Sequence, residues 1–523
     1  MTTQIVWFKR DLRWHDHAPL TAAAARGSVL ALYVIEPELW HQPDSSSRHW
    51  QFIRESLIDL SQALQRLGGT FVLQSGGVTQ ILQRLRDHYG IFELHSHEET
   101  GNAWTYARDL QVAEWCAENG IVWHEYPSNG VVRRLGNRDR WAALRNATMA
   151  KPQVKLSVRI SFAPVPLALS AESIPEIADP RFGSSTPRVQ RGGRTEGLKV
   201  LASFLDDRSE RYMTTISKPG VSARHCSRLS AHIAYGTLSA REIEHALRRR
   251  IDHLEGIGDH SSLRWARQLQ AFGSRLAWRC HFVQKLEQQP AIETHCMHSA
   301  FEGMREDDFR QDWFEAWCEG QTGYPLVDAC MRSLHANGWI TFRMRAMLVA
   351  FASYHLWLDW RRTAPFMARL FTDYEPGIHY SQFQMQSGVT GINAIRIYNP
   401  VKQSCDHDPE GRFIRRYLPE LRDVPEDYIH EPWLMPTPPK SYPAPLVEHE
   451  AAARLAKQRM AAYRRGEDFK AEAAKVYRKL GSRNRPSEGR RKKPTEPLPQ
   501  LSLGFMMRSL VEREGLEPST PAL

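Results

Sequence analysis

Two groups of polar residues in the second half of the chain have the types and spacing needed to hold a ligand. Ser227, Arg228 and Ser230 precede an apolar helical run. Hydroxyls, backbone N–H groups and a helix N-terminus together favour an anion such as a pyrophosphate. Ordinary capping of the helix is the simpler interpretation of these residues taken alone. The pattern therefore indicates an anion site without deciding for it.

The second group consists of Arg345, Asp373 and Glu375. Burial of an Arg and two carboxylates in a helical domain would force them to pair with one another or to meet polar atoms of a ligand. A structural ion pair is the simpler interpretation from these residues alone.

Four segments carry a family resemblance. VWFKRDLRWHDHAPL near the N-terminus resembles the opening of photolyases and cryptochromes, and TGYPLVDACMRSLHANGWITFRMRAMLVAFASYHLWLDW resembles their flavin-binding helices. CSRLSAHIAYGTLS from Cys226 and RIYNPVKQSCDHDPEGRFIRRYLPEL from Arg396 follow in the family's order and spacing. The resemblance runs from residue 4 to about residue 465, so the chain is similar to members of this family over most of its length.

The resemblance implies FAD as the cofactor. Its phosphates would be held by Tyr212, Ser227, Arg228, Leu229 and Ser230, with Arg279 assisting. Cys226 stands where the family usually has Thr, so one hydroxyl contact would be lost.

The resemblance also places residues around the flavin ring. Arg345 and Asp373 would pair beside the isoalloxazine, and Glu375, in place of the family's usual Asp, would hydrogen-bond the ring edge. His379 falls at the position facing flavin N5, which is Asn in most repair enzymes and Asp in plant-type cryptochromes. A His at this position could donate or accept a hydrogen bond and would tune the flavin.

The implied activity is transfer of an electron from excited, reduced FAD to a DNA lesion stacked nearby. Trp278 matches a residue of the aromatic wall for flipped-out bases, and Met385 replaces the second wall Trp. Arg343 and Arg396 fall where the family contacts phosphates of the lesion strand.

Several positions depart from the family pattern. Arg275 replaces the Glu that usually binds a cyclobutane dimer, and Asp406 replaces a DNA-contacting Lys, although Lys402 is close. Thr341 and Phe342 stand where enzymes for (6-4) photoproducts carry paired His residues. The sequence thus assigns neither lesion class.

The tryptophans that carry photoreduction in the family are also incomplete. Trp360 matches the middle one, whereas Phe383 and Asp307 replace the inner and outer ones. Other aromatic residues offer candidates for another route: Trp313, Trp317, Tyr354, Trp357 and Tyr380. An antenna pigment is a further expectation from the family, but Thr105 replaces the usual folate-binding Glu and leaves its identity open.

The elements that must position these residues fall into two lobes. Alternating apolar runs and amphipathic stretches predict βαβ units with a parallel sheet over residues 1–135. The expected strands are Gln4–Lys9, Val29–Ile35, Thr70–Gln74, Ile91–His95 and Ile121–Tyr126, and a helix with Ser46 or Ser47 as N-cap follows the second. Neither a G-x-G-x-x-G nor a P-loop motif is present.

The rest of the chain is expected to be helical. Residues 136–196 are interpreted as an interdomain connection, 197–480 as an all-α FAD-binding domain and 481–523 as a disordered basic tail. The tail contains QLSLGF, whose Gln500, Leu503 and Phe505 resemble peptides that dock on the replicative sliding clamp. A chance apolar patch explains this segment equally well.

Composition sets the remaining limits. The net charge of +10 makes a polyanionic partner plausible, and no apolar run approaches the ~18 residues needed to span a bilayer. The seven cysteines include no C-x-x-C pair. His95 and His97 alternate on an expected strand and would share one face, as metal ligands can, but two solvent-facing or packed histidines explain the spacing as well, so no metal site is predicted.

The sequence as a whole predicts a cytoplasmic, monomeric photolyase acting on UV-damaged DNA. A cryptochrome-like photoreceptor without repair activity is the alternative. A flavoprotein that binds nucleic acid without photochemistry is the third interpretation.

Overall fold

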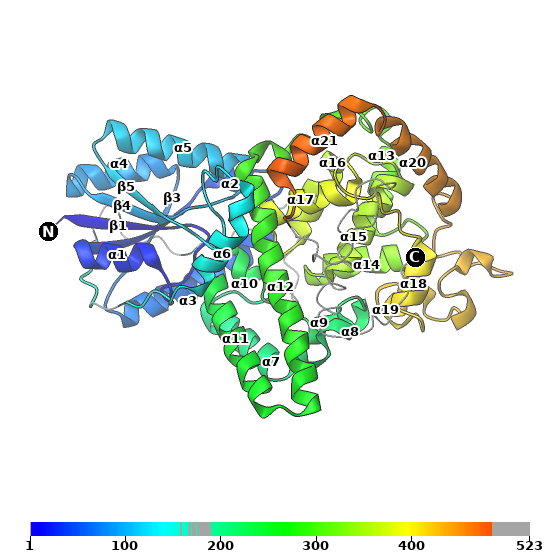
Figure 1. The fold of residues 1–523 in the computed structure, drawn as a ribbon, viewed down its shortest axis with the longest axis horizontal. Coiled ribbons are helices and arrows are strands. Elements are labelled where there is room, and N and C mark those ends of the chain that lie inside the picture. Colours follow the sequence, from blue (N-terminus) through cyan, green and yellow to red (C-terminus); the bar gives the residue numbers. More distant parts are fainter. Residues whose placement is uncertain (1, 157–158, 166–168, 170–173, 175–189, 484–523) are drawn as a thin grey trace, which may run out of the picture.

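A five-stranded parallel sheet forms the amino-terminal lobe of the computed structural model, which describes residues 2–156, 159–165, 169, 174 and 190–483. The strand order is β3-β2-β1-β4-β5. The strands are β1 (Thr3–Phe8), β2 (Ser28–Ile35), β3 (Phe71–Ser75), β4 (Glu93–His97) and β5 (Val122–Tyr126). Their carboxyl ends face the helical lobe, as Figure 1 shows.

Alternation along the central strand builds a core on each face of the sheet. Val6 and Phe8 pack on one side, whereas Ile5 and Trp7 pack on the other. The helices that cover the two faces are α1 (Ala18–Arg26), α2 (Pro37–Trp40), α3 (Ser47–Arg66), α4 (Val78–Tyr89) and α5 (Ala103–Glu118). This is the parallel α/β lobe that the sequence predicts.

Two local predictions shift in the structure. The fourth strand begins at Glu93 rather than Ile91, because Ile91 is 64% exposed whereas His97 is buried through a hydrogen bond to Asp11. Ser46 does precede α3, but its hydroxyl donates to the carbonyl of Arg369 instead of capping the helix. Both differences arise from long-range polar contacts that local patterns do not contain.

The second lobe is α-helical in its described part. Its longer helices are α7 (Arg194–Asp206), α11 (Ala240–Ile257), α12 (His260–Gln288), α13 (Gln311–Glu319), α14 (Pro325–Asn337), α15 (Phe342–Ala350), α16 (Trp360–Leu370), α17 (Pro376–Ser387), α20 (His449–Tyr463) and α21 (Glu467–Leu480). Shorter helices are α8 (Tyr212–Thr215), α9 (Pro219–His225), α10 (Ser230–Ala234), α18 (Pro400–His407), α19 (Arg412–Tyr417) and the π-helix η7 (Phe351–His355). Helix α6 (Trp141–Ala150) lies within the segment expected to connect the lobes.

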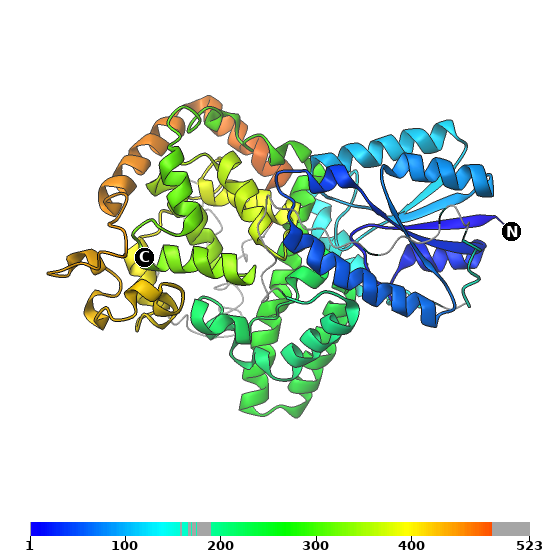
Figure 2. The same cartoon turned by 180° about the vertical axis from the view of Figure 1, so that it is seen from behind.

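The two lobes lie side by side, as Figure 2 shows from behind, and polar contacts join them. Arg10, at the carboxyl end of β1, donates to the carbonyls of Ala234 and Tyr374. Asp16 accepts hydrogen bonds from Ser239 and Arg241. Within the described ranges, no helix is long and apolar enough to cross a membrane.

Candidate functional site

Helix α17 lies between α12 and α15, and two ion pairs tie its amino-terminal end to these neighbours. Arg345 on α15 donates to Asp373 over 2.9 Å, and Arg279 on α12 donates to Glu375 over 2.6 Å. The structure therefore brings together Arg345, Asp373 and Glu375, which the sequence analysis placed around a flavin ring. It adds Arg279, which the sequence analysis placed with the phosphates.

The charges of this group compensate one another. Burial raises the pKa of Asp373, but Arg345 and a hydrogen bond from Ser230 outweigh it, so the pKa of this carboxyl falls below its ordinary value. Burial lowers the pKa of Arg228 to about 10, opposed by the attraction of Asp373. Asp373 is thus ionised, and it links the ring site to the Ser227–Ser230 segment.

Several polar atoms here are buried without a partner among the described residues. They are Asp373 Oδ1, Arg279 Nη1 and Arg275 Nε. A buried carboxylate oxygen and guanidinium nitrogens without partners cost free energy unless a polar ligand meets them. The donors and the acceptor match a ligand that carries both acceptor and donor groups.

The segment before α10 has an unusual backbone. Arg228 adopts φ +59°, a left-handed conformation that costs a non-glycine residue roughly 1–2 kcal/mol. Its guanidinium lies over the Trp339 ring at 4.3 Å, and Ser227 Oγ accepts from the Leu229 N–H over 3.3 Å. Leu229 is fully buried, so it contributes packing and backbone rather than a polar side chain.

Two residues beside this segment belong with the residues predicted to hold the FAD phosphates. Tyr212 is buried and hydrogen-bonded to Arg275. Burial raises the pKa of Cys226 to about 12, so this thiol stays protonated and offers only a weak donor in place of the family's Thr hydroxyl.

His379 on α17 is held in one tautomer. Its Nε2 lies 2.9 Å from the carbonyl oxygen of Ala364, and because a carbonyl only accepts, Nε2 carries the proton. Burial lowers the pKa of His379 to about 3, so the ring is neutral and Nδ1 keeps a lone pair. The ring packs against Tyr374 and Phe383, with centroids 5.2 and 4.6 Å away. His379 can therefore accept a hydrogen bond through Nδ1.

The predicted DNA contacts lie on the same helices and on one loop. Trp278 on α12 is half-buried, and its ring stacks on Phe282 at 5.4 Å. Met385 on α17 is half-buried, as is Arg396 in the loop that follows. Arg343 is exposed at the start of α15 and donates to Ser217 Oγ over 3.1 Å.

A group of cations surrounds His407 near Arg343. Burial and, after it, the charges of Arg343, Lys218 and Lys402 together lower the pKa of His407 to about 4, against the opposing charge of Asp406. Lys402 also pairs with Asp406 at 3.3 Å. Lys218 was not predicted from the sequence, where an isolated Lys carries no signal. These exposed cations form a surface suited to phosphates.

The expected gap in the tryptophan series is visible in the structure. Trp360 is buried at the start of α16, with the Arg361 guanidinium 4.9 Å from its ring centre. Phe383 is buried beside His379, whereas Asp307 is exposed. Neither Phe nor Asp offers the easily oxidised indole of the standard series.

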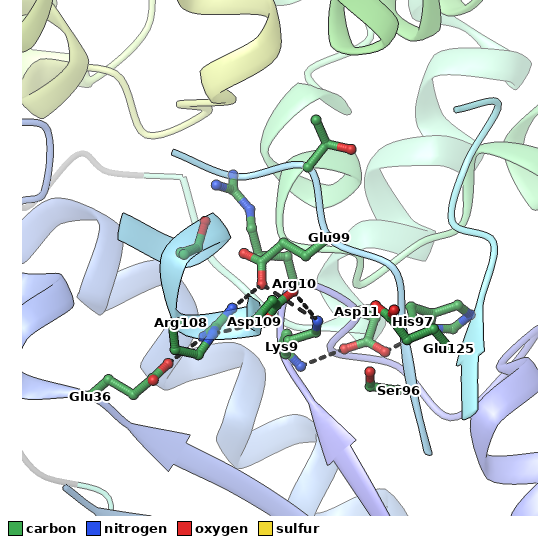
Figure 3. Close-up of polar contacts among 12 residues, drawn as sticks. Lys9, Arg10, Asp11, Glu36, Ser96, His97, Glu99, Arg108, Asp109 and Glu125 are labelled. Carbon is green, nitrogen blue, oxygen red and sulfur yellow. Dashed lines mark hydrogen bonds and ion pairs between the residues drawn. The ribbon is translucent and has the colours of Figure 1, made fainter. Parts of the chain in front are cut away.

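A cavity opens at the carboxyl ends of the strands. It is lined by residues of both lobes: Trp7, Tyr33, Glu36, Trp40, His49, Asn102, Thr105, Arg108, Tyr235 and Tyr374. Figure 3 shows the ion pairs beside it, in which Lys9 contacts Asp109 at 3.0 Å and Arg108 contacts Glu99 at 2.6 Å and also Glu36. Thr105 donates to the carbonyl of Asn102 over 2.9 Å. Sequence reasoning missed Lys9 and Arg108 because their partners are distant in the chain.

Comparison with known proteins identifies this architecture. Residues 4–136 match a family model described as DNA photolyase, and residues 272–462 match the FAD binding domain of DNA photolyase. A deoxyribodipyrimidine photo-lyase of Vibrio cholerae is 32% identical over 487 residues, covering 86% of this chain and 97% of the relative. A cryptochrome DASH of Gloeobacter violaceus is 28% identical, covering 85% and 93%.

A solved structure supports the same conclusion. An archaeal photolyase from Sulfolobus tokodaii, described with two FAD molecules, superposes with a TM-score of 0.72 at 25% identity, covering 88% of this chain and all of that one. The fold and the matched models thus define a two-lobed flavoprotein. The chain belongs to the photolyase and cryptochrome family, and its cofactor is FAD.

The residues present fit this cofactor. Asp373 Oδ1 is an unpartnered buried acceptor for a ring N–H, and Arg279 Nη1 is an unpartnered donor for a carbonyl or phosphate oxygen.

Proposed function

We propose that this protein is a light-dependent DNA repair enzyme that splits UV-induced pyrimidine lesions. The observation that carries the proposal is the cationic surface of Lys218, Arg343 and Lys402 around His407, which lies on the lobe that holds the buried flavin site. A DNA strand bound there would be positioned through its phosphates. The similarity to a photo-lyase over most of the chain supports the same activity.

The chain's own residues would divide the work. Bound FAD supplies light absorption and a transferable electron. Arg345 and Asp373 would fix the ring, because their ion pair is buried and leaves Asp373 Oδ1 free. His379 would accept a hydrogen bond from the ring through Nδ1 and hold no proton of its own there. Trp278 would exclude water beside an extruded base.

The second candidate is a photoreceptor without repair activity. Arg275 and Met385 favour it, because neither reproduces the family's contacts to a cyclobutane dimer. The similarity to a cryptochrome DASH agrees with this candidate.

One assay separates the two candidates. Purified protein, chemically reduced, is illuminated with oligonucleotides that carry either a cyclobutane dimer or a (6-4) photoproduct. Restored pyrimidines in either substrate support repair, and Arg343→Ala should then slow repair at limiting DNA while the flavin spectrum stays unchanged. Both lesions remaining intact while the flavin responds to light would favour the photoreceptor.

We also propose that the cavity at the carboxyl ends of the strands holds an antenna pigment. Trp7, Trp40 and Tyr33 offer flat apolar contacts for a conjugated ring system. Trp40→Ala should lower the amount of a second pigment in purified protein, seen by absorbance after extraction, without lowering FAD content.

The clamp-docking peptide of Gln500, Leu503 and Phe505 lies outside the described residues and stays a proposal. Leu503→Ala with Phe505→Ala should abolish retention on an immobilised sliding clamp. Unchanged retention would refute it.

A further inference from the structure

A cluster of metal-ligating side chains lies on the sheet face that α1 covers, away from the flavin site. Glu93 and His95 occupy alternate positions of β4 and share this face, and His124 is the register partner of His95 on β5. One ligand atom from each of these residues lies within 4.8 Å of the others. The sequence analysis considered His95 with His97, whereas the structure groups His95 with His124.

The distances are close to those of a metal site. Glu93 Oε2 lies 2.8 Å from His124 Nε2 and 3.9 Å from His95 Nε2. Ligand atoms around a tetrahedral Zn²⁺ are roughly 3.3 Å apart, given bond lengths of about 2.0–2.1 Å. Glu93 and His124 are partly exposed and can adjust, whereas the His95 side chain is fully buried. Small changes in the Glu93 and His124 side-chain torsions would therefore complete the arrangement.

A cationic group already contacts two of the three members of this cluster. Arg26 Nη1, from the last turn of α1, lies 2.7 Å from Glu93 Oε2 and 2.8 Å from His124 Nε2. A guanidinium only donates, so it needs a lone pair on Nε2, whereas the contact between Nε2 and the carboxylate needs a proton there. Either tautomer of His124 leaves one short contact mismatched. A metal ion would satisfy both lone pairs at once.

The surroundings support coordination through His95. Its Nδ1 lies 3.1 Å from the Tyr126 hydroxyl, which can accept the ring N–H once Nε2 binds a metal. Such a partner on the second nitrogen is the usual arrangement for a ligating His. His95 Nε2 now contacts Gln4 Oε1 at 2.7 Å, so the Gln4 amide would have to turn aside. Arg26 is 46% exposed along its side chain and can leave into solvent.

A second His cluster in the same lobe lacks these features. Asp11 Oδ2 contacts both His17 Nε2 at 2.8 Å and His97 Nδ1 at 2.7 Å. The Leu20 N–H donates to His17 Nδ1, so His17 carries its proton on Nε2 and donates it to the carboxylate. These three side chains are buried, and their hydrogen bonds match in type. This cluster is a satisfied structural network.

We infer that Glu93, His95 and His124 bind a divalent transition-metal ion, with water as a fourth ligand and with displacement of the Arg26 guanidinium. Two imidazoles and one carboxylate select Zn²⁺, Ni²⁺ or Cu²⁺ over Mg²⁺ and Ca²⁺. Glu93 begins β4, whose amino-terminal end points away from the helical lobe in Figure 1, so the site is independent of the proposed repair activity.

Cobalt serves as the probe, because tetrahedral Co²⁺ gives strong visible absorption. Full-length protein freed of metal by a chelator is titrated with Co²⁺, and one equivalent should develop this band and be displaced by Zn²⁺. His124→Ala and Glu93→Gln should each lose the band while the bound-flavin spectrum shows that the protein remains folded. His88→Ala, which alters an exposed His on α4, should keep it.

Arg26→Ala tests the displacement step. Without the competing guanidinium, Co²⁺ should bind roughly two- to fivefold more tightly, the equivalent of an exposed ion pair. The inference is overturned if wild-type protein gives no band, or if the band survives in both His124→Ala and Glu93→Gln. Equal or weaker binding by Arg26→Ala would overturn the displacement.

Discussion

His379 gives a quantitative prediction about stability and pH. Burial lowers its pKa to about 3 in the folded protein, against an ordinary value of 6.5. Between pH 6.5 and pH 3 the unfolded chain therefore binds a proton at this position, whereas the folded protein does not. The stability contributed by the neutral ring is fully present above pH 6.5 and is lost progressively as the pH falls towards 3.

The size of the effect follows from the two pKa values. Between pH 8 and pH 5, protonation of this one residue in the unfolded chain lowers the free energy of unfolding by about 2 kcal/mol. His379→Asn has no such group, so it should lack this part of the pH dependence. Other buried histidines, such as His49 and His97, are present in both proteins and cancel in the difference.

The assay is urea unfolding of wild type and His379→Asn at pH 8, 6.5 and 5, with saturating FAD and with tryptophan fluorescence as the signal. The difference in free energy of unfolding should shift by about 2 kcal/mol in favour of the variant between pH 8 and pH 5. His253→Asn, which changes an exposed His on α11, is the control and should show no such shift. A wild-type-to-variant difference that stays constant with pH would refute a neutral, buried His379.

Three further predictions concern packing, charge and DNA. Gly236→Ala should lower the free energy of unfolding by at least ~2 kcal/mol in urea titrations, because φ is +66° and the new Cβ would lie 2.3 Å from a backbone oxygen of the other lobe. Arg345→Leu should release FAD on gel filtration more readily than the double variant Arg345→Leu with Asp373→Asn, because the single change leaves a buried carboxylate unpaired, at a cost of about 3–5 kcal/mol. Arg343→Ala with Lys402→Ala should reduce the salt slope of DNA binding by up to about 2, measured by fluorescence anisotropy; an unchanged slope would mean that neither cation contacts a phosphate.

Local patterns in the sequence predicted the elements well where apolar periodicity dominates. The ends of the first two strands lie within one residue of their predicted positions. The prediction is this close because Val6, Phe8 and their neighbours alternate in the way that a sheet covered on both faces requires. The fourth strand was displaced because His95 and His97 are polar residues that are buried only by partners elsewhere in the chain.

In the candidate site, too, some features were predicted from the sequence and others depend on partners that are distant in the chain. The resemblance to the family named Arg345, Asp373 and Glu375, and the structure adds that Arg279 pairs with Glu375. Tautomers could not be predicted, because the proton on His379 is set by a carbonyl fifteen positions away on another helix. Spacing within a helix or strand predicts which side chains lie on the same face. It does not predict which residue of a distant element will be their hydrogen-bond partner.

The cavity at the strand ends is lined by both lobes, and this shared lining has an optical consequence. Tyr374 and Pro376, the chain neighbours of Glu375, contribute to its wall, and Arg10 bridges the two lobes there. A pigment bound in this cavity would contact the same short stretch of backbone that we propose orients the isoalloxazine. The angle between the two transition dipoles would then be set when the chain folds, so the yield of excitation transfer would depend little on motion of one lobe against the other.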